Sequence, residues 1–202
     1  TTTKLSREHT VDRPAPGFVS IAGGKYTTYR VMGKDAVDRA VIELRRITQD
    51  SVTEKLPLVG ADGYFALEQQ KERIAQESGL AVETVTHLLN RYGSLISEIL
   101  ELIAQEPKLA KKLDADLPYI KAEIVYAATH EGARTVDDVI SRRTRLSFEA
   151  VNHGVHLADE VAALIAPVLG WSAKERKESI AQYMELVERE IVALDELLEV
   201  NS

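Results

Sequence analysis

The sequence contains no cysteine, which excludes disulfide bonds, thiolate metal sites and a cysteine nucleophile. This absence fits a reducing compartment, so we expect a cytoplasmic protein. Long apolar runs are missing too: the longest nearly uncharged stretch, residues 161–173, is about half of the roughly 20 residues that a membrane-spanning helix needs, and Pro167 interrupts it. No signal-peptide pattern opens the chain. The first residue is Thr rather than Met, so we expect a piece of a longer protein.

Motifs of several enzyme classes are also missing. The sequence has no Ser-His-Asp order, no paired-carboxylate motif and no Walker A spacing. It has no Gly-x-Gly-x-x-Gly fingerprint either. That last absence removes the main nucleotide-binding element that a flavin or nicotinamide enzyme needs.

The five histidines raise the question of a metal site. His153 and His156 are three residues apart, and Glu149 and Glu160 each lie four residues from one of them. Gly154 interrupts this stretch, however, and such acid–histidine spacings arise freely in an acidic helical chain. We therefore expect no metal site.

What is present is an acidic composition typical of a folded protein. The 202 residues include 25 Lys and Arg against 32 Asp and Glu, a net charge of −7, and 45% are hydrophobic. This balance argues against bulk nucleic-acid binding. Residues 1–48 carry nine basic and five acidic residues, a net +4, so the remainder carries −11. The basic segment suits a small anion, although a solvated basic helix face would give the same count.

Periodicity separates the first region from the rest. Residues 18–22 form a short β-branched and aromatic run that follows turn formers and ends at Gly23 and Gly24. The segment around residues 9–11 is a candidate hairpin partner. Apolar residues at helical spacing then predict a helix over residues 28–46, with a threonine as its N-cap.

Everything after about residue 62 has helical periodicity. Capping residues, glycines and prolines divide it into helices predicted over residues 64–78, 82–92, 95–105, 118–132, 135–144, 155–169 and 172–199. We therefore expect a mainly α protein: an all-α helical bundle over residues 64–202, a linker over residues 48–63, and a preceding β-hairpin and helix over residues 1–47.

The Gly-Gly-Lys turn between the predicted strand and helix carries the most chemistry. Gly23 and Gly24 let the backbone approach a ligand closely, because no Cβ stands in the way. The following helix N-terminus offers free N–H groups and a partial positive charge, and Lys25 adds a full charge. Together they would hold an anion or stabilise negative charge on a bound ring. A plain strand-to-helix turn would have the same sequence.

Two further patterns each have two interpretations. The arginines at positions 142, 143 and 145 could grip an anion, but in so acidic a region we favour pairing with acids such as Glu131, Asp137 and Asp138. The last predicted helix carries an a/d-type stripe of Ile180, Met184, Val187, Ile191, Leu194 and Leu198. We favour packing of this stripe within its own bundle over self-association.

Two segments together resemble FAD-dependent (respiratory, aerobic) glycerol-3-phosphate dehydrogenases. Residues 6–9 (Ser-Arg-Glu-His) and 23–30 (Gly-Gly-Lys-Tyr-Thr-Thr-Tyr-Arg) are similar to the end of that family's flavin domain. Residues 118–133 and 135–146 are similar to its C-terminal helical domain. The resemblance implies a C-terminal fragment in which residues 1–47 are a remnant of the α/β flavin domain.

The resemblance also implies an activity and a set of site residues. Glycerol 3-phosphate would be oxidised to dihydroxyacetone phosphate, with hydride transfer from C2 to FAD and electrons passed to a quinone. Arg7 matches the family's phosphate-binding arginine, and Lys25 matches a lysine near substrate and flavin. Gly23, Gly24, Lys25, Tyr26 and Thr27 match the loop that faces the flavin ring. No residue of the helical domain is assigned a catalytic role.

Two alternatives stay open at this stage. The chain could be a helical interaction module without chemistry of its own, or part of a glycerol-phosphate oxidase that passes electrons to oxygen. We expect the fragment alone to be inactive. The resemblance allows a peripheral position of the intact enzyme at the inner face of the cell membrane, and it leaves homo-oligomer formation open.

Overall fold

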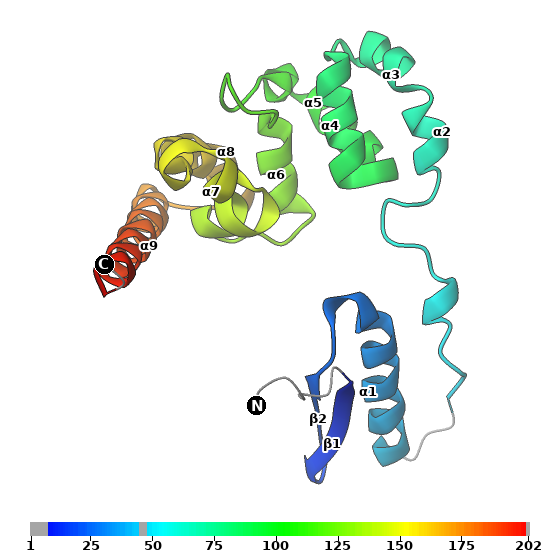
Figure 1. The fold of residues 1–202 in the computed structure, drawn as a ribbon. Coiled ribbons are helices and arrows are strands. Elements are labelled where there is room, and N and C mark those ends of the chain that lie inside the picture. The colour runs from blue at the N-terminus through cyan, green and yellow to red at the C-terminus, as the bar shows by residue number, and fades with distance from the viewer. Residues whose placement is uncertain (1–7, 45–47, 201–202) are drawn as a thin grey trace. The chain divides into compact units, whose positions relative to one another are not determined.

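A hairpin with one long helix, followed by a series of mostly shorter helices, makes up the structure (Figure 1). The computed structural model describes residues 8–44 and 48–200. The chain divides into a first unit, Thr1–Leu58, and a second unit, Val59–Ser202. The mainly helical content after a short hairpin confirms the fold class that the sequence predicts.

The first unit begins with the predicted hairpin. β1 (His9–Ala15) and β2 (Phe18–Gly23) pair in antiparallel fashion, with His9 opposite Gly23. Gly17 has a φ of +76° in the connecting turn, a conformation that costs glycine little because it has no Cβ. The alternation within the strands and the turn residues are local signals, and here they are sufficient to predict the hairpin.

A single long helix completes the first unit. The short turn η2 (Tyr26–Thr28) leads directly into α1 (Tyr29–Leu44), which packs against both strands. Farther along the chain, Arg30 Nη1 donates a hydrogen bond of 3.2 Å to Oγ1 of Thr53, in η3 (Thr53–Lys55). The predicted helix over residues 28–46 is thus confirmed up to Leu44, and residues 45–47 lie outside the described residues.

The first unit has no closed core of its own. None of its described residues is fully buried. Its exposed large apolar side chains are Phe18, Ile21, Tyr26, Tyr29, Val31, Val37, Ile42, Leu44, Val52, Leu56 and Leu58. A hairpin with a single helix is marginally stable in water unless its apolar faces are covered. The described apolar side chains of the first unit thus lack cover within that unit.

The second unit is entirely helical in its named elements. They are α2 (Tyr64–Glu68), α3 (Lys71–Ser78), α4 (Val82–Tyr92), η4 (Gly93–Leu95), α5 (Ile96–Gln105), η5 (Pro107–Ala110), α6 (Lys121–Thr129), the π-helix η6 (Asp138–Arg143), α7 (Leu146–Glu149), η7 (Val151–Leu157), α8 (Ala158–Leu169) and α9 (Ala173–Val200). Within the described ranges, no helix combines the length and apolarity needed to cross a bilayer.

Two clusters of buried apolar side chains stabilise the second unit. The first cluster lies among α3, α4, α5 and α6 and includes Leu88 and Ile99. The second lies among α6, η6, α8 and α9 and includes Ile165. α6 supplies Tyr126 to the first cluster and Ile124 to the second. It is therefore the central helix that both clusters share.

Two predicted helix starts are confirmed by reciprocal hydrogen bonds. The Ser172 N–H donates to Glu175 Oε2 at 2.7 Å, and the Glu175 N–H donates to Ser172 Oγ at 3.3 Å. Thr135 and Asp138 exchange the same pair of bonds at 3.1 and 3.0 Å. Each pair satisfies backbone donors that a helix start would otherwise leave unpaired.

Three predicted boundaries are wrong. The helix expected over residues 64–78 is interrupted between α2 and α3, because Gln70 leaves the helical region with φ −107° and ψ 10°. The helix expected over residues 118–132 begins only at Lys121 and ends at Thr129. α8 begins at Ala158 rather than near residue 155. Apolar spacing continues across each of these breaks, so it does not reveal them.

Candidate functional site

The Gly23–Gly24 turn is shaped by close packing against its own unit. Gly23 and Gly24 have φ values of +79° and +84°, which favour glycine. A Cβ on Gly24 would lie 2.6 Å from Met32 Sδ, and a Cβ on Gly23 would lie 3.0 Å from the Glu8 carbonyl oxygen. Both positions therefore require glycine, for the backbone angle and for the space.

Lys25 and Thr28 close the turn onto the helix. The Lys25 N–H donates to Thr28 Oγ1 at 3.3 Å, and that hydroxyl donates to the Lys25 carbonyl at 2.9 Å. The N-cap position is thus Lys25, with φ −130° and ψ 151°, and the expectation of a threonine N-cap is wrong. Thr28, three residues after Lys25, instead caps the turn through these two hydrogen bonds.

The surface of this turn is open. Lys25, Tyr26 and Thr27 are exposed, and the Tyr26 side chain is 93% exposed. The first N–H groups of a helix have no partner within the helix and carry partial positive charge. With the Lys25 ammonium beside them, they make a small electropositive surface. Such a surface can hold an anion or stabilise negative charge on a ligand.

His9 holds the hairpin beside α1 at the same end of the first unit. Its Nε2 lies 2.7 Å from Asp35 Oδ2, which joins β1 to the first half of α1. Arg7, the predicted phosphate-binding residue, lies outside the described residues. The structure brings the other predicted site residues, 23–27, together in one turn.

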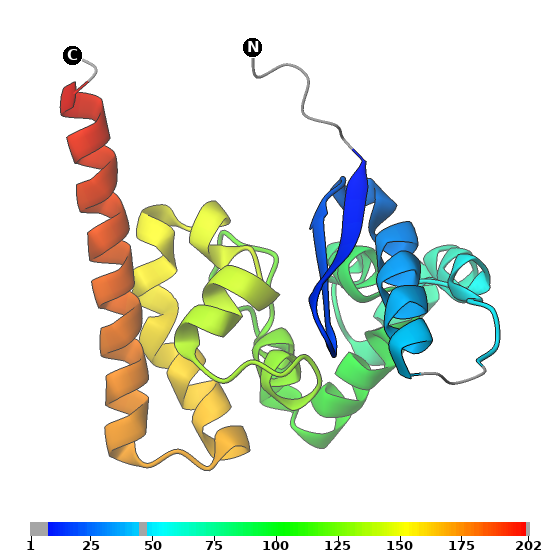
Figure 2. The ribbon, with the colours of Figure 1, turned by 90° about the horizontal axis from the view of Figure 1, so that it is seen from below.

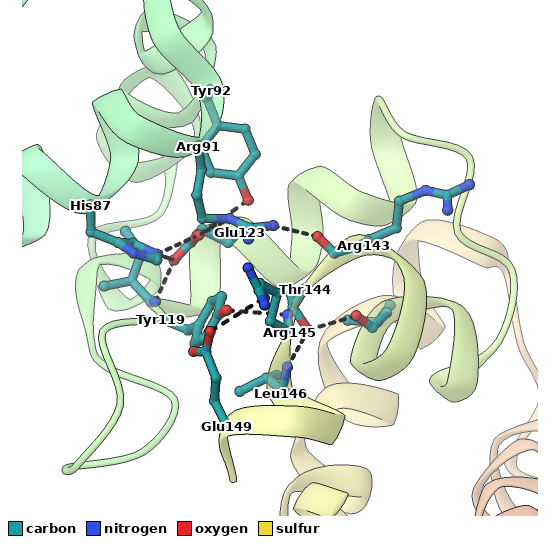
Figure 3. A network of polar contacts seen from close by, with 12 residues as sticks. His87, Arg91, Tyr92, Tyr119, Glu123, Arg143, Thr144, Arg145, Leu146 and Glu149 are labelled. Atoms are coloured by element: carbon teal, nitrogen blue, oxygen red, sulfur yellow. Dashed lines mark hydrogen bonds and ion pairs between the residues drawn. The ribbon is translucent and has the colours of Figure 1, made fainter. Parts of the chain in front are cut away.

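A second polar cluster, which the sequence did not predict, lies in the second unit around Glu123 (Figure 3). Glu123 is 0% exposed. Its carboxylate oxygens lie 3.0 and 3.2 Å from His87 Nε2, and one of them accepts a 3.1 Å hydrogen bond from Tyr92 Oη. The Ile120 N–H donates to the carboxylate at 2.8 Å. A buried carboxylate is tolerable only with such partners.

Arg91 extends this Glu123 cluster toward η6. Its Nε lies 3.4 Å from Glu123 Oε1, and its guanidinium lies 5.4 and 5.3 Å from the ring centres of Tyr92 and Tyr119. It also donates a hydrogen bond to the Arg143 carbonyl (Figure 3). Burial raises the pKa of the Tyr92 hydroxyl, so Tyr92 stays a neutral donor.

The geometry gives this Glu123 cluster a structural role. His87, Arg91 and Tyr92 come from α4, Glu123 from α6, and the accepting carbonyl of Arg143 from the end of η6. The cluster therefore ties the elements of the two apolar cores together. One signal could have revealed it: Glu123 is an acid three residues after Ile120, within the apolar stripe of α6.

The arginine cluster pairs largely within the chain, as favoured from the sequence. Arg142 forms ion pairs with Asp137 and Asp138. Arg145 Nε lies 3.6 Å from Glu149 Oε1. The remaining arginine, at position 143, donates from Nε to the Glu131 carbonyl at 2.7 Å, so there the acceptor is the backbone and not the predicted carboxylate.

His153 and His156, the two histidines three residues apart, make separate contacts. His156 Nε2 lies 3.0 Å from Asp114 Oδ2. Asn152 and His153 have positive φ values of 48° and 53°, and the Tyr183 hydroxyl donates to the His153 carbonyl. Over the part of the chain that the structure describes, no three or more His, Cys, Asp or Glu residues group as metal ligands would.

Comparisons with known proteins all find similarity to enzymes named for glycerol phosphate. A family model described as the C-terminal domain of alpha-glycerophosphate oxidase matches residues 51–176. Glycerol-3-phosphate dehydrogenase 2 of Mycobacterium tuberculosis (strain H37Rv) is 50% identical over 192 residues, which are 95% of this chain and 33% of that protein. The mitochondrial glycerol-3-phosphate dehydrogenase SDP6 of Arabidopsis thaliana is 33% identical over 93% of this chain and 32% of its own.

The fold is similar to that of a solved structure. The glycerol-3-phosphate dehydrogenase from Bacillus halodurans, solved in complex with FAD, has a TM-score of 0.69 and 23% identity. The similarity covers 84% of this chain and 35% of that one. The chain thus spans about a third of the length of the relatives that it matches.

Proposed function

Because the matching family model covers more than half of its residues, the chain belongs to the family of the C-terminal domain of alpha-glycerophosphate oxidase, and we propose that it is the C-terminal part of an FAD-dependent glycerol-3-phosphate dehydrogenase. The intact enzyme oxidises the C2 hydroxyl of glycerol 3-phosphate to the ketone of dihydroxyacetone phosphate. The observation that carries this proposal is 50% identity, across 95% of the chain, to a protein named glycerol-3-phosphate dehydrogenase.

In this proposal the two units have different origins. Residues 1–47 are the last strands and helix of the flavin domain, residues 48–63 are a linker, and residues 64–202 are the helical C-terminal domain. The absence of any fully buried described residue in the first unit supports this division, since the missing part of the flavin domain would cover its apolar side chains. The independent apolar cores of the second unit support it as well.

The residues of the glycine turn fit a flavin. Lys25, Tyr26 and Thr27 are exposed, and the two glycines before them have no side chain, so a flat ring can approach the backbone of this turn. FAD supplies the hydride acceptor of the reaction when it is bound. Lys25 and the N–H groups of Tyr26 and Thr27 stabilise negative charge at the bound group, through the ammonium charge and the helix dipole.

Two residues bind the substrate in this proposal. Arg7 holds the phosphate with its planar guanidinium, which suits bidentate binding of phosphate oxygens. Lys25 lies near substrate and flavin and adds a positive charge there. The electrons leave to a quinone, so the intact enzyme works in the cytoplasm as a peripheral protein at the inner face of the membrane.

We expect the 202-residue chain alone neither to bind FAD nor to oxidise glycerol 3-phosphate. The pyrophosphate-binding fingerprint is missing from its sequence, and that fingerprint normally supplies the nucleotide site. FAD titration followed by flavin fluorescence, and anaerobic mixing with glycerol 3-phosphate, test this directly. The full-length protein should bind FAD, and its flavin should lose its oxidised absorbance on mixing.

Submicromolar FAD binding by the isolated chain would contradict the inference that FAD binding needs a pyrophosphate site that this chain lacks. A full-length flavoprotein that glycerol 3-phosphate does not reduce would contradict the proposed function itself. Reduction by glycerol 3-phosphate with fast reoxidation by oxygen, and none by a quinone, would favour the alternative of a glycerol-phosphate oxidase. The description of the matching family model, which names an oxidase, is the reason to test that alternative.

A further inference from the structure

The last helix is longer than the bundle on which it packs. α9 has 28 residues, about 42 Å at 1.5 Å per residue, whereas its neighbour α8 has 12 residues, about 18 Å. Figure 2 shows the C-terminal end of α9, drawn in red, extending past the yellow helices of the bundle. The proposed dehydrogenase function does not use this part of α9.

The apolar stripe of α9 contains both buried and exposed side chains. Ile180, Tyr183 and Val187 are buried in the second apolar cluster, which confirms the intramolecular packing favoured for Ile180 and Val187. Met184 and Ile191, from the same stripe, are 41% and 37% exposed. The side chains of Leu194 and Leu198 lie outside the described part of the structure. Of the four stripe residues whose side chains are described, two are thus buried in the bundle and two are exposed.

A groove runs beside the open part of the stripe. It encloses about 300 Å³ between α9 and η7. It is lined by Asn152, Val155, Met184, Val187, Glu188, Ile191 and Val192. Five of these seven side chains are apolar, and three of them on α9, Met184, Val187 and Ile191, follow the i, i+3, i+7 spacing that receives another helix. We call this surface the α9 groove.

The charge around the α9 groove restricts what can occupy it. Residues 184–200 contain six Asp or Glu residues and a single arginine, Arg189, a net charge of −5. Arg189 already lies 3.8 Å from Glu185, its own neighbour on α9. A second copy would bring two such acidic surfaces together, and anionic lipid or nucleic acid would also be repelled.

We propose that the α9 groove is the docking site for a cationic amphipathic helix of a partner protein. Apolar side chains of that helix fill the groove between Met184, Val187 and Ile191, as in a short two-helix seam. Its flanking Lys or Arg side chains pair with acids of α9 such as Glu188. This proposal is independent of the dehydrogenase activity and goes beyond it.

The test uses the full-length protein and two synthetic helical peptides. Both peptides carry Leu at every a and d position, and they differ only in having Lys or Glu at every e and g position. Binding is measured by fluorescence anisotropy at low and high salt. We expect the Lys peptide to bind, about tenfold more weakly at high salt, and the Glu peptide not to bind.

Matched variants locate the binding. Ile191→Ser and Glu188→Lys should each weaken binding of the Lys peptide about tenfold or more, and both variants should stay folded, because both side chains are exposed. The control variants Phe65→Ser on α2 and Glu101→Lys on α5, also exposed, should bind like the wild type.

Four results would overturn the proposal. The Lys and Glu peptides could bind equally well, or the groove variants could bind like the controls. The wild type could sediment as a dimer that Ile191→Ser dissociates, which would make a second copy the occupant. Finally, the full-length wild type could fail to bind the Lys peptide at all.

Discussion

Replacing Arg7 with alanine in the full-length protein is expected to lower kcat/KM for glycerol 3-phosphate by about 30- to 1000-fold. In the proposed site Arg7 binds the substrate phosphate, and truncation would remove its charge-assisted hydrogen bonds. Loss of such a contact costs roughly 2–4 kcal/mol, which corresponds to this range at about 1.4 kcal/mol for each factor of ten. Steady-state kinetics over a range of substrate concentrations measure the effect.

Two controls separate phosphate binding from a general loss of activity. Arg7→Lys should recover part of the activity, because a point charge replaces the guanidinium without its bidentate geometry. Unphosphorylated glycerol has no phosphate, so the Arg7→Ala variant should oxidise it about as slowly as the wild type does. Equal loss on both substrates would contradict the assignment of Arg7.

Replacing Glu123 with alanine is expected to destabilise the helical unit by about 3–5 kcal/mol, the usual cost of breaking a buried charge pair from one side. The change leaves the Tyr92 hydroxyl and the Ile120 N–H without their acceptor, and it leaves Arg91 without its carboxylate. Because the Glu123 cluster joins both apolar cores, we expect them to lose stability together. Urea denaturation followed by circular dichroism measures the loss.

Glu98 offers a matched control for Glu123. It accepts a 2.6 Å hydrogen bond from the Tyr126 hydroxyl, but its side chain is partly exposed. Glu98→Ala should therefore cost only about 1 kcal/mol, because water can replace the lost acceptor. Similar losses for the two variants would show that the buried Glu123 cluster does not hold the unit together.

Local signals in the sequence predict the elements of this fold well. The hairpin follows from turn residues and alternation, and the start of α9 follows from Ser172 and Glu175. Each depends on residues a few positions apart, which interact in the same way in almost any surrounding. The positive φ values of Asn152 and His153 could not be predicted in this way. They are stabilised in part by the Tyr183 hydroxyl, 30 residues away in sequence.

The partners of Glu123 on α4 could not be predicted from sequence patterns for the same reason. His87 and Tyr92 lie 36 and 31 residues from Glu123 in sequence, and only the folded arrangement of the helices brings them together. In the glycine turn, by contrast, residues 23–27 are adjacent in the chain, so the sequence identifies the turn. Its proposed role depends on the resemblance to known dehydrogenases, because the remaining parts of a flavin site lie in other segments.

The flavin midpoint potential of full-length Lys25→Ala tests the central claim, that this glycine turn faces the flavin. A lysine beside the flavin favours the reduced, more negative state, so its removal should lower the two-electron potential. A charge effect of about 1.4–2.8 kcal/mol corresponds to about 30–60 mV. We expect this negative shift in Lys25→Ala, and a potential near the wild-type value in Lys25→Arg. A potential unchanged or raised in Lys25→Ala, with FAD still bound, would contradict it.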